Sequence, residues 1–196
     1  MNKYGPVPHI KMPSRTWPDK VLSQSPIWCS VDLRDGNQAL INPMTPDQKM
    51  RFFNMLVRTG FKEIEISFPA ASKADYDFTR ALIDNGHIPD DTTIQVLTQA
   101  REHLIDKTFQ AIAGASRTIV HLYNSTSPAQ REIVFNKSPQ EIIRLATDGV
   151  KMVKERAVKQ NNRIILEYSP ESFSQTELSF ASDICNAVIE AWAPEK

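Results

Sequence analysis

Charged and hydrogen-bonding side chains follow or end several short apolar runs of this 196-residue sequence. The residues in these positions are Arg34, Asp35, Gln38, Glu65, Ser67, Thr98, Gln99, His121, Tyr123, Asn124, Glu167, Ser169 and Glu171. The set contains carboxylates, an imidazole and a guanidinium, but no lysine. A carboxylate beside an imidazole suits a divalent metal, and an arginine nearby suits stabilisation of a developing oxyanion. These residue types therefore indicate a metal site next to an oxyanion-stabilising group.

Five of the charged or titratable residues also have a structural explanation. Arg34 and Asp35 could form a surface ion pair, and Glu171 could cap a loop. His121 could be a core histidine that donates to a backbone carbonyl, and Glu65 could form a salt bridge inside a barrel. Their predicted convergence at one edge of a sheet favours a functional role, although spacing alone leaves both explanations open.

Five strand and helix pairs in series must position these side chains. Short apolar runs rich in β-branched residues predict strands at 27–33, 61–68, 93–97, 117–122 and 163–168. Amphipathic stretches predict helices at 45–60, 73–85, 101–113, 138–159 and 174–192. This order predicts a parallel sheet with right-handed crossovers, in which the carboxyl ends of the strands share one edge.

Capping residues indicate where three of the helices begin. Thr45-Pro46-Asp47-Gln48 combines an N-cap, a proline in the first turn and a capping-box glutamine, and Gly60 is placed to end that helix. Ser138-Pro139-Gln140-Glu141 has the same pattern. The segment 174–177 predicts a cap for the last helix.

An open doubly wound sheet and a (β/α)₈ barrel both fit this order of elements. The first strand is followed by RDGNQ and not by a glycine-rich phosphate-binding turn, which favours the barrel over a nucleotide-binding sheet. A closed barrel needs eight units and about 250 residues. We therefore expect an α/β protein with about the first five units of a (β/α)₈ barrel over 27–196, preceded by a proline-rich extended arm at 1–26. The sequence is expected to be the front portion of a longer protein.

Composition narrows the class of protein further. The 23 Lys and Arg residues balance 23 Asp and Glu residues, which argues against a dedicated nucleic-acid-binding protein. No apolar run approaches the roughly 20 residues that span a bilayer, and the amino terminus lacks a signal-peptide core. Cys29 and Cys185 are far apart and lie in no recognisable motif. These features predict a cytoplasmic protein with reduced thiols and with neither nucleic-acid nor membrane partners.

One motif has a close match among known enzymes. Leu-Arg-Asp-Gly-Asn-Gln at 33–38, followed after ten residues by Lys49, resembles the first signature of the isopropylmalate, homocitrate and citramalate synthase family. Hydroxymethylglutaryl-CoA lyases are relatives of that family. The stretches 32–44, 62–72, 121–127 and 167–177 are similar to the isopropylmalate synthases within it.

The resemblance implies a metal-dependent, Claisen-type condensation. Acetyl-CoA would be joined to 2-oxoisovalerate, giving 2-isopropylmalate and CoA in the first committed step of leucine biosynthesis. The cofactor implied is a divalent cation, either Mg²⁺, Mn²⁺ or Zn²⁺, that polarises the oxo group. The longer protein would be a homodimer.

The resemblance also implies roles for individual residues. Asp35 matches a metal ligand, and Arg34 would stabilise the alkoxide or enolate oxygen. Glu171 would orient Arg34 or the metal-bound ligands, and His121 and Ser169 would line the oxo acid pocket. Weaker candidates, placed behind these residues, are Gln38 and Glu65.

The sequence departs from the family's pattern in one respect. The family's second signature, a His-x-His pair, is absent from this chain, as are the segments expected to carry the catalytic base and to bind leucine as an inhibitor. We therefore expect the chain alone to be catalytically inactive.

Three alternatives remain. A sibling synthase could use pyruvate or 2-oxoglutarate, although the second carboxylate of 2-oxoglutarate would need a cation, and Arg117, at the start of its strand, points to the opposite edge. A non-catalytic half-barrel could associate with itself. An open nucleotide-binding sheet is disfavoured by the absent glycine-rich turn.

Overall fold

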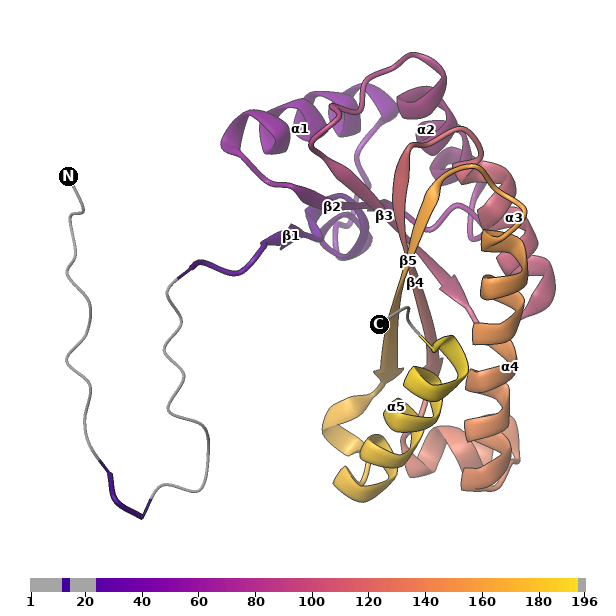
Figure 1. The fold of residues 1–196 in the computed structure, drawn as a ribbon. Coiled ribbons are helices and arrows are strands. Elements are labelled where there is room, and N and C mark those ends of the chain that lie inside the picture. The colour runs from indigo at the N-terminus through magenta and orange to yellow at the C-terminus, as the bar shows by residue number, and fades with distance from the viewer. Residues whose placement is uncertain (1–11, 15–23, 194–196) are drawn as a thin grey trace.

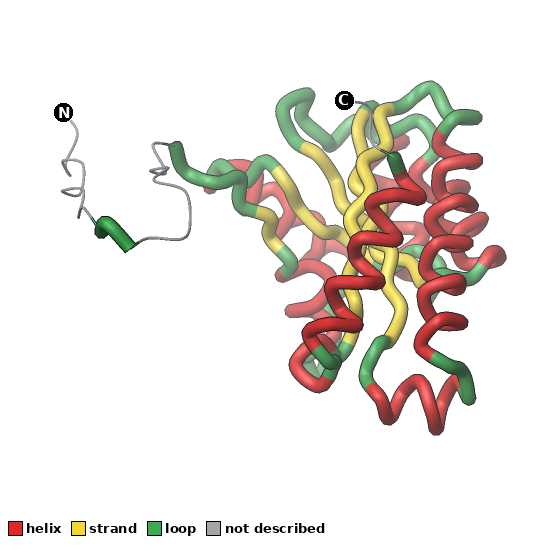
Figure 2. Tube along the Cα trace, turned by 60° about the horizontal axis from the view of Figure 1, so that its bottom comes forward, coloured by secondary structure: helices red, strands yellow, loops and turns green. Residues whose placement is uncertain are grey.

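The computed structural model describes residues 12–14 and 24–193. The core of this part is one parallel sheet with the strand order β1-β2-β3-β4-β5. The strands are β1 (Cys29–Ser30), β2 (Glu63–Ser67), β3 (Thr93–Gln99), β4 (Arg117–Ser125) and β5 (Arg163–Glu171). The helices are α1 (Pro46–Thr59), α2 (Lys73–Asp84), α3 (Glu102–Ile112), α4 (Pro139–Ala157) and α5 (Leu178–Trp192). The sheet curls into a half-barrel with helices packed along it (Figure 1, Figure 2). The predicted α/β fold, with five units of barrel type, is confirmed.

The two faces of the sheet differ in chemistry because successive residues of a strand point to opposite sides. Ile64, Ile94 and Val120 belong to the fully buried hydrophobic core, together with apolar side chains of α1 to α5. Residues at odd-numbered positions contact one another on the other face. The polar members of this layer are Glu65, Gln95, His121 and Glu167. The concave face therefore carries the groups that could do chemistry.

Local sequence signals explain where α1 and α4 begin. The Thr45 hydroxyl accepts a hydrogen bond from the Gln48 backbone, and the Gln48 side chain accepts one from the Thr45 backbone. Ser138 and Glu141 form the same capping box at α4. Gly60 ends α1 with a φ of 103°, a left-handed conformation that favours glycine. These predicted helix boundaries are confirmed.

The first predicted strand is wrong in length. Only Cys29–Ser30 pairs with β2, and the chain then forms a five-residue π-helical turn over Asp32–Gly36. The backbone N–H groups of Arg34, Asp35 and Gly36 all donate to the Val31 carbonyl, and the Leu33 side chain is fully buried. The apolar residues that suggested a strand instead anchor a turn.

The ends of β4 and β5 and the segments that follow them also differ from their predictions. Phe173–Gln175 forms a 3₁₀ turn, α5 begins at Leu178, and Glu177 stands at the N-cap without a capping hydrogen bond from its side chain. Strands β4 and β5 continue past their predicted ends at 122 and 168. A π-helical turn at Gln130–Phe135, between β4 and α4, was not predicted. Tertiary contacts of Glu177, described below, explain why the predicted cap did not form.

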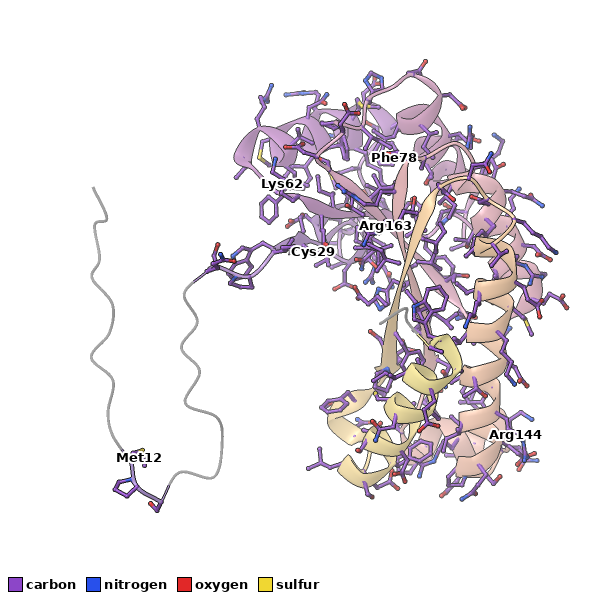
Figure 3. The ribbon with its side chains drawn as sticks, viewed as in Figure 1. Met12, Cys29, Lys62, Phe78, Arg144 and Arg163 are labelled. Carbon is purple, nitrogen blue, oxygen red and sulfur yellow. The ribbon has the colours of Figure 1, made fainter. Side chains whose placement is uncertain are left out.

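The two ends of the sheet are well separated. Figure 3 shows Arg163, at the start of β5, far from Arg144 in the first half of α4, which follows the carboxyl end of β4. The predicted arm at 1–26 lies outside the described residues except for 12–14 and 24–26, so its boundary stays a prediction. No helix in the described part of the chain is long and apolar enough to cross a membrane.

Candidate active site

A cavity of about 860 Å³ lies at the carboxyl end of the strands. The predicted site residues that line it are Arg34, Asp35, Gln38, His121, Ser169 and Glu171. Glu65 is fully buried and contacts two of them. The structure therefore brings together side chains that are up to 137 positions apart, from 34 to 171 in the sequence.

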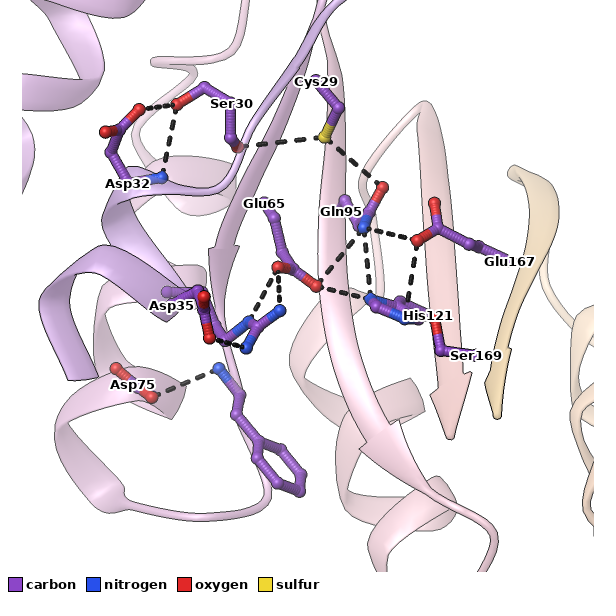
Figure 4. Close-up of polar contacts among 12 residues, drawn as sticks. Cys29, Ser30, Asp32, Asp35, Glu65, Asp75, Gln95, His121, Glu167 and Ser169 are labelled. Atoms are coloured by element: carbon purple, nitrogen blue, oxygen red, sulfur yellow. Dashed lines mark hydrogen bonds and ion pairs between the residues drawn. The ribbon is translucent and has the colours of Figure 1, made fainter. Parts of the chain in front are cut away.

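Two of the three charged side chains in the turn Asp32–Gly36 lie in different surroundings near the cavity. Because Leu33 is buried beneath the turn, Arg34 and Asp35 project toward the cavity. The Arg34 side chain is 15% exposed, whereas that of Asp35 is 64% exposed. Arg34 Nη1 donates to Asp35 Oδ1 at 2.7 Å, so the predicted pair forms at the rim of the cavity (Figure 4).

Glu65 holds the guanidinium of Arg34 from inside the half-barrel. Arg34 Nε donates to Glu65 Oε2 at 2.7 Å, and Nη2 lies 2.6 Å from the same oxygen (Figure 4). Of the five N–H donors of the guanidinium, Nε thus bonds to Glu65 and one N–H of Nη1 bonds to Asp35, while Nη2 makes an ion-pair contact with Glu65. The salt bridge suggested by the sequence is confirmed, and Glu65, a weaker candidate there, is a direct partner of Arg34.

The other oxygen of Glu65 continues the network to β4 and β5. Glu65 Oε1 lies 2.8 Å from His121 Nδ1, and His121 Nε2 lies 2.7 Å from Ser169 Oγ. A carboxylate can only accept, so Nδ1 is the donor, and in a neutral imidazole Nε2 then accepts from the Ser169 hydroxyl. The partners of His121 are therefore side chains, and the suggested bond to a backbone carbonyl is wrong.

Glu65 is ionised although it has no exposed surface. Burial by itself raises the pKa of Glu65, but the hydrogen bond from His121 and the charge of Arg34 outweigh it and lower that pKa below its usual value. The carboxylate therefore provides a fixed negative charge that orients both partners at neutral pH.

Gln95 belongs to this network and was not predicted. Its Nε2 lies 3.3 Å from Glu65 Oε1 and 3.4 Å from Glu167 Oε1, and its Oε1 lies 3.6 Å from Cys29 Sγ. Burial, followed by the charges of Glu65 and Glu167, raises the pKa of the Cys29 thiol to about 12. The available sequence signal was a polar residue at an inward position of a buried strand.

Lys49 also lines the cavity, which corrects the expectation that no lysine lies at this edge. It is 5% exposed, and its Nζ lies 2.6 Å from Asp75 Oδ1 and 5.2 Å from the centre of the Phe78 ring. The other oxygen of Asp75 accepts from the Phe68 backbone at 3.2 Å. Lys49 comes from α1 and not from a strand end, so a search of strand ends missed it.

Apolar side chains form part of the cavity wall. Phe68, Leu97 and Tyr123 line it, and the rings of Phe68 and Tyr123 meet edge to face with centres 6.3 Å apart. Gln99 Nε2 donates to the Tyr123 hydroxyl at 2.7 Å, and burial raises the pKa of Tyr123. The cavity thus combines a charged floor with a wall suited to an aliphatic group.

Glu171 lines the cavity but does not pair with Arg34. The Ser125 hydroxyl donates to Glu171 Oε2 at 2.6 Å, and the Glu171 carbonyl accepts from both Thr126 N and Thr126 Oγ1 at 3.0 Å. Among the described residues, the carboxylate partners of Arg34 are Asp35 and Glu65. A role of Glu171 toward metal-bound ligands stays a prediction.

The described residues do not by themselves fit a divalent cation. Asp35 offers an exposed carboxylate, but residues 12–14 and 24–193 contain no group of three or more His, Cys, Asp or Glu side chains arranged to hold a metal ion. Asp35 therefore represents at most one ligand of a larger set.

Comparison with known proteins identifies close relatives. A family model described as HMGL-like matches residues 25–195. A 2-isopropylmalate synthase of Pseudomonas putida (strain W619) is 56% identical over 193 residues, which are 98% of this chain and 35% of the relative. A 2-isopropylmalate synthase of Clostridium acetobutylicum is 54% identical over 198 residues, 100% of this chain and 36% of the relative. The chain thus spans about a third of the length of these curated relatives.

A solved structure supports the fold. The HMG-CoA lyase of Bacillus subtilis superposes with a TM-score of 0.61 at 19% sequence identity, covering 84% of this chain and 55% of the lyase. At this identity the likeness concerns the fold alone, and it agrees with the half-barrel described above.

Proposed function

The chain belongs to the HMGL-like family, and from this we propose that it forms the first part of the catalytic barrel of a 2-isopropylmalate synthase. The proposed enzyme condenses acetyl-CoA with 2-oxoisovalerate to give 2-isopropylmalate and CoA, the first committed step of leucine biosynthesis. The observation that carries this proposal is Arg34, which two carboxylates hold in the charged floor of a cavity with a partly apolar wall.

Arg34 would bind the oxo group of the substrate. Its guanidinium lines the cavity, and Glu65 and Asp35 keep the guanidinium plane from rotating. In the condensation, the methyl carbon of acetyl-CoA, after losing a proton, bonds to the oxo carbon, and the carbonyl electron pair moves onto oxygen. Donors already aimed at that oxygen stabilise its charge without reorganising. Water then cleaves the thioester and releases CoA.

The remaining side chains of the cavity would select the oxo acid. His121 and Ser169 present a linked polar pair, and Phe68, Leu97 and Tyr123 provide an apolar wall for an isopropyl group. The second carboxylate of 2-oxoglutarate would need an unpaired cation, but Lys49 is paired with Asp75. Arg117 donates to Thr93 at the opposite end of the strands. These contacts favour 2-oxoisovalerate over 2-oxoglutarate.

A divalent cation, Mg²⁺, Mn²⁺ or Zn²⁺, would polarise the oxo group as a Lewis acid when bound. We include Asp35 as one of its ligands and assign to Glu171 the orientation of the groups around it. Both residues line the cavity, as does Gln38. Because the described residues do not complete a metal site, we propose that this chain by itself does not form 2-isopropylmalate. The homodimer and the cytoplasmic location belong to the same proposal for the longer protein.

Isothermal titration of the purified chain with 2-oxoisovalerate tests the proposal, with and without Mg²⁺ or Mn²⁺. We expect binding that Arg34→Ala abolishes and that Arg163→Ala leaves unchanged, because Arg163 starts β5 at the opposite end of the sheet. Pyruvate and 2-oxoglutarate serve as competing ligands and are expected to bind more weakly. Tighter binding of 2-oxoglutarate would contradict the substrate assignment, and CoA release by the chain in a thiol assay would contradict its inactivity.

One observation favours the non-catalytic half-barrel as a second candidate. Both edge strands leave apolar groups accessible, since Ile27 and Trp28 next to β1 are 70% and 69% exposed, and Leu166 and Tyr168 of β5 are only partly buried. Sedimentation over a hundredfold range of concentration distinguishes the candidates. Self-association without binding of any oxo acid would favour the module over the enzyme.

A further inference from the structure

We propose that Arg131 is a positioning residue that fixes Glu171 at the rim of the cavity. Arg131 lies in the turn Gln130–Phe135 after β4, and Glu171 is the last residue of β5. The proposal rests on the proposed function only in giving Glu171 the role of orienting the groups around the cation, which include the bound oxo acid.

Arg131 is a buried cation with three of its N–H donors engaged and an aromatic ring beside its guanidinium. It is 5% exposed, its Nη1 donates to the Thr126 carbonyl at 2.8 Å, and Nη1 and Nη2 each donate to one oxygen of Glu177 at 2.8 Å. The guanidinium carbon lies 4.5 Å from the centre of the Phe180 ring. Arg131 thereby joins the segment after β4 to the segment that begins α5.

A short series of hydrogen bonds leads from Arg131 to Glu171. Thr126, whose carbonyl Arg131 holds, donates from both its backbone N and its Oγ1 to the Glu171 carbonyl at 3.0 Å. The same hydroxyl lies 2.8 Å from the Thr176 hydroxyl. The neighbouring Ser125 donates to the Glu171 carboxylate at 2.6 Å. Both the backbone and the carboxylate of Glu171 are therefore fixed by residues next to the carbonyl that Arg131 binds.

The geometry requires arginine and not merely a positive charge. A planar guanidinium can donate two parallel hydrogen bonds to a carboxylate and still reach a carbonyl, whereas a lysine ammonium is a single point donor. The hydrogen bond from Arg131 lowers the pKa of Glu177 to about 2, in agreement with a tight pair. This pairing also explains why Glu177 does not cap α5 with its side chain.

Arg156 provides a matched control for a purely stabilising role. It is also a largely buried arginine with two carboxylate partners, Asp106 at 2.5 Å and Glu102 at 3.2 Å, and it donates to the Met152 carbonyl at 3.1 Å. These contacts join α4 to α3 in the helical layer, and none of these residues lines the cavity. Arg156→Lys should therefore weaken the fold without moving Glu171.

The test compares Arg131→Lys with Arg156→Lys in the whole chain. Amide hydrogen exchange is measured at Thr126, whose N–H is bonded to Glu171, and 2-oxoisovalerate binding is measured by titration. We expect exchange at Thr126 to accelerate at least tenfold in Arg131→Lys, with affinity at least fivefold weaker, and neither change in Arg156→Lys. If Arg131→Lys does not fold, Glu177→Gln replaces it with the same expectation.

Unchanged exchange at Thr126 in Arg131→Lys, or equal acceleration in both variants, would overturn the positioning role. Unchanged affinity despite local acceleration would also overturn it. If the unmodified chain does not bind 2-oxoisovalerate, the proposed function fails for this chain. In that case exchange alone decides whether Arg131 fixes Glu171.

Discussion

Replacing Glu65 by glutamine removes the one charge on which the arrangement of the cavity floor depends. Glu65 has no exposed surface, and its carboxylate binds Arg34 through one oxygen and His121 through the other. Glutamine has nearly the same shape but one oxygen and one NH₂ group. If the amide NH₂ faces the guanidinium, a donor meets a donor. If it faces Nδ1, the imidazole must change tautomer to accept it, and the guanidinium then meets a neutral oxygen instead of a carboxylate.

The size of the effect follows from burial. Removing one partner of a buried ion pair costs about 3–5 kcal/mol, because the other charge is left without compensation. Arg34 retains Asp35, and the amide oxygen retains one hydrogen bond. We therefore expect the low end of this range, about 3 kcal/mol of unfolding free energy at pH 7.

The effect of the substitution depends on pH in a defined direction. The pKa of Glu65 is lower in the folded protein than in the unfolded chain, where it is near the ordinary value of 4.5. Its contribution to stability is therefore complete above about pH 4.5 and is lost as the pH falls through the folded pKa. The difference between the original protein and Glu65→Gln should shrink below pH 4.5.

Urea unfolding followed by circular dichroism at pH 7 and pH 4 measures both quantities. Glu167→Gln is the matched control, because Glu167 is 44% exposed and lies 3.4 Å from His121 Nε2. We expect it to cost about 1 kcal/mol or less. A Glu65→Gln cost no larger than that of the control, or a difference that grows as the pH falls, would refute the reasoning.

Three other substitutions or reactions test separate parts of the structure. Gly149→Ala should destabilise the protein by about 1–3 kcal/mol in urea unfolding, because the new Cβ would lie 2.8 Å from the Ala100 Cβ. A gain in stability would show that α4 shifts freely. Thr45→Ala should cost about 1 kcal/mol by removing the capping box of α1, and no loss would mean that packing alone sets that boundary. The pKa of Cys29 is raised to about 12, so its thiol should react with iodoacetamide at pH 8 at least tenfold more slowly than free cysteine does. An equal rate would contradict its burial beside Glu65.

Features governed by neighbouring residues could be predicted from the sequence. Capping boxes and Gly60 act over three or four positions, so the start and end of α1 follow from the residues themselves. The alternation of Ile64, Glu65 and Ile66 in β2 similarly predicts one apolar and one polar face. The predicted cap of α5 was wrong, because the Glu177 side chain bonds to Arg131 instead of to the backbone at the start of the helix.

The residues of the candidate site also separate into those that the sequence predicted and those that only the tertiary structure identified. The sequence alone placed Arg34, His121 and Ser169 at one edge, because parallel strands in series bring their carboxyl ends together whatever their exact register. Only the tertiary structure decided that Glu65 holds Arg34, that Gln95 bridges two carboxylates, and that Lys49 enters the cavity wall from a helix. Such pairings depend on strand register and helix packing to within about one side-chain length. Those distances are set by the packing of the whole core, and no local stretch of sequence contains them.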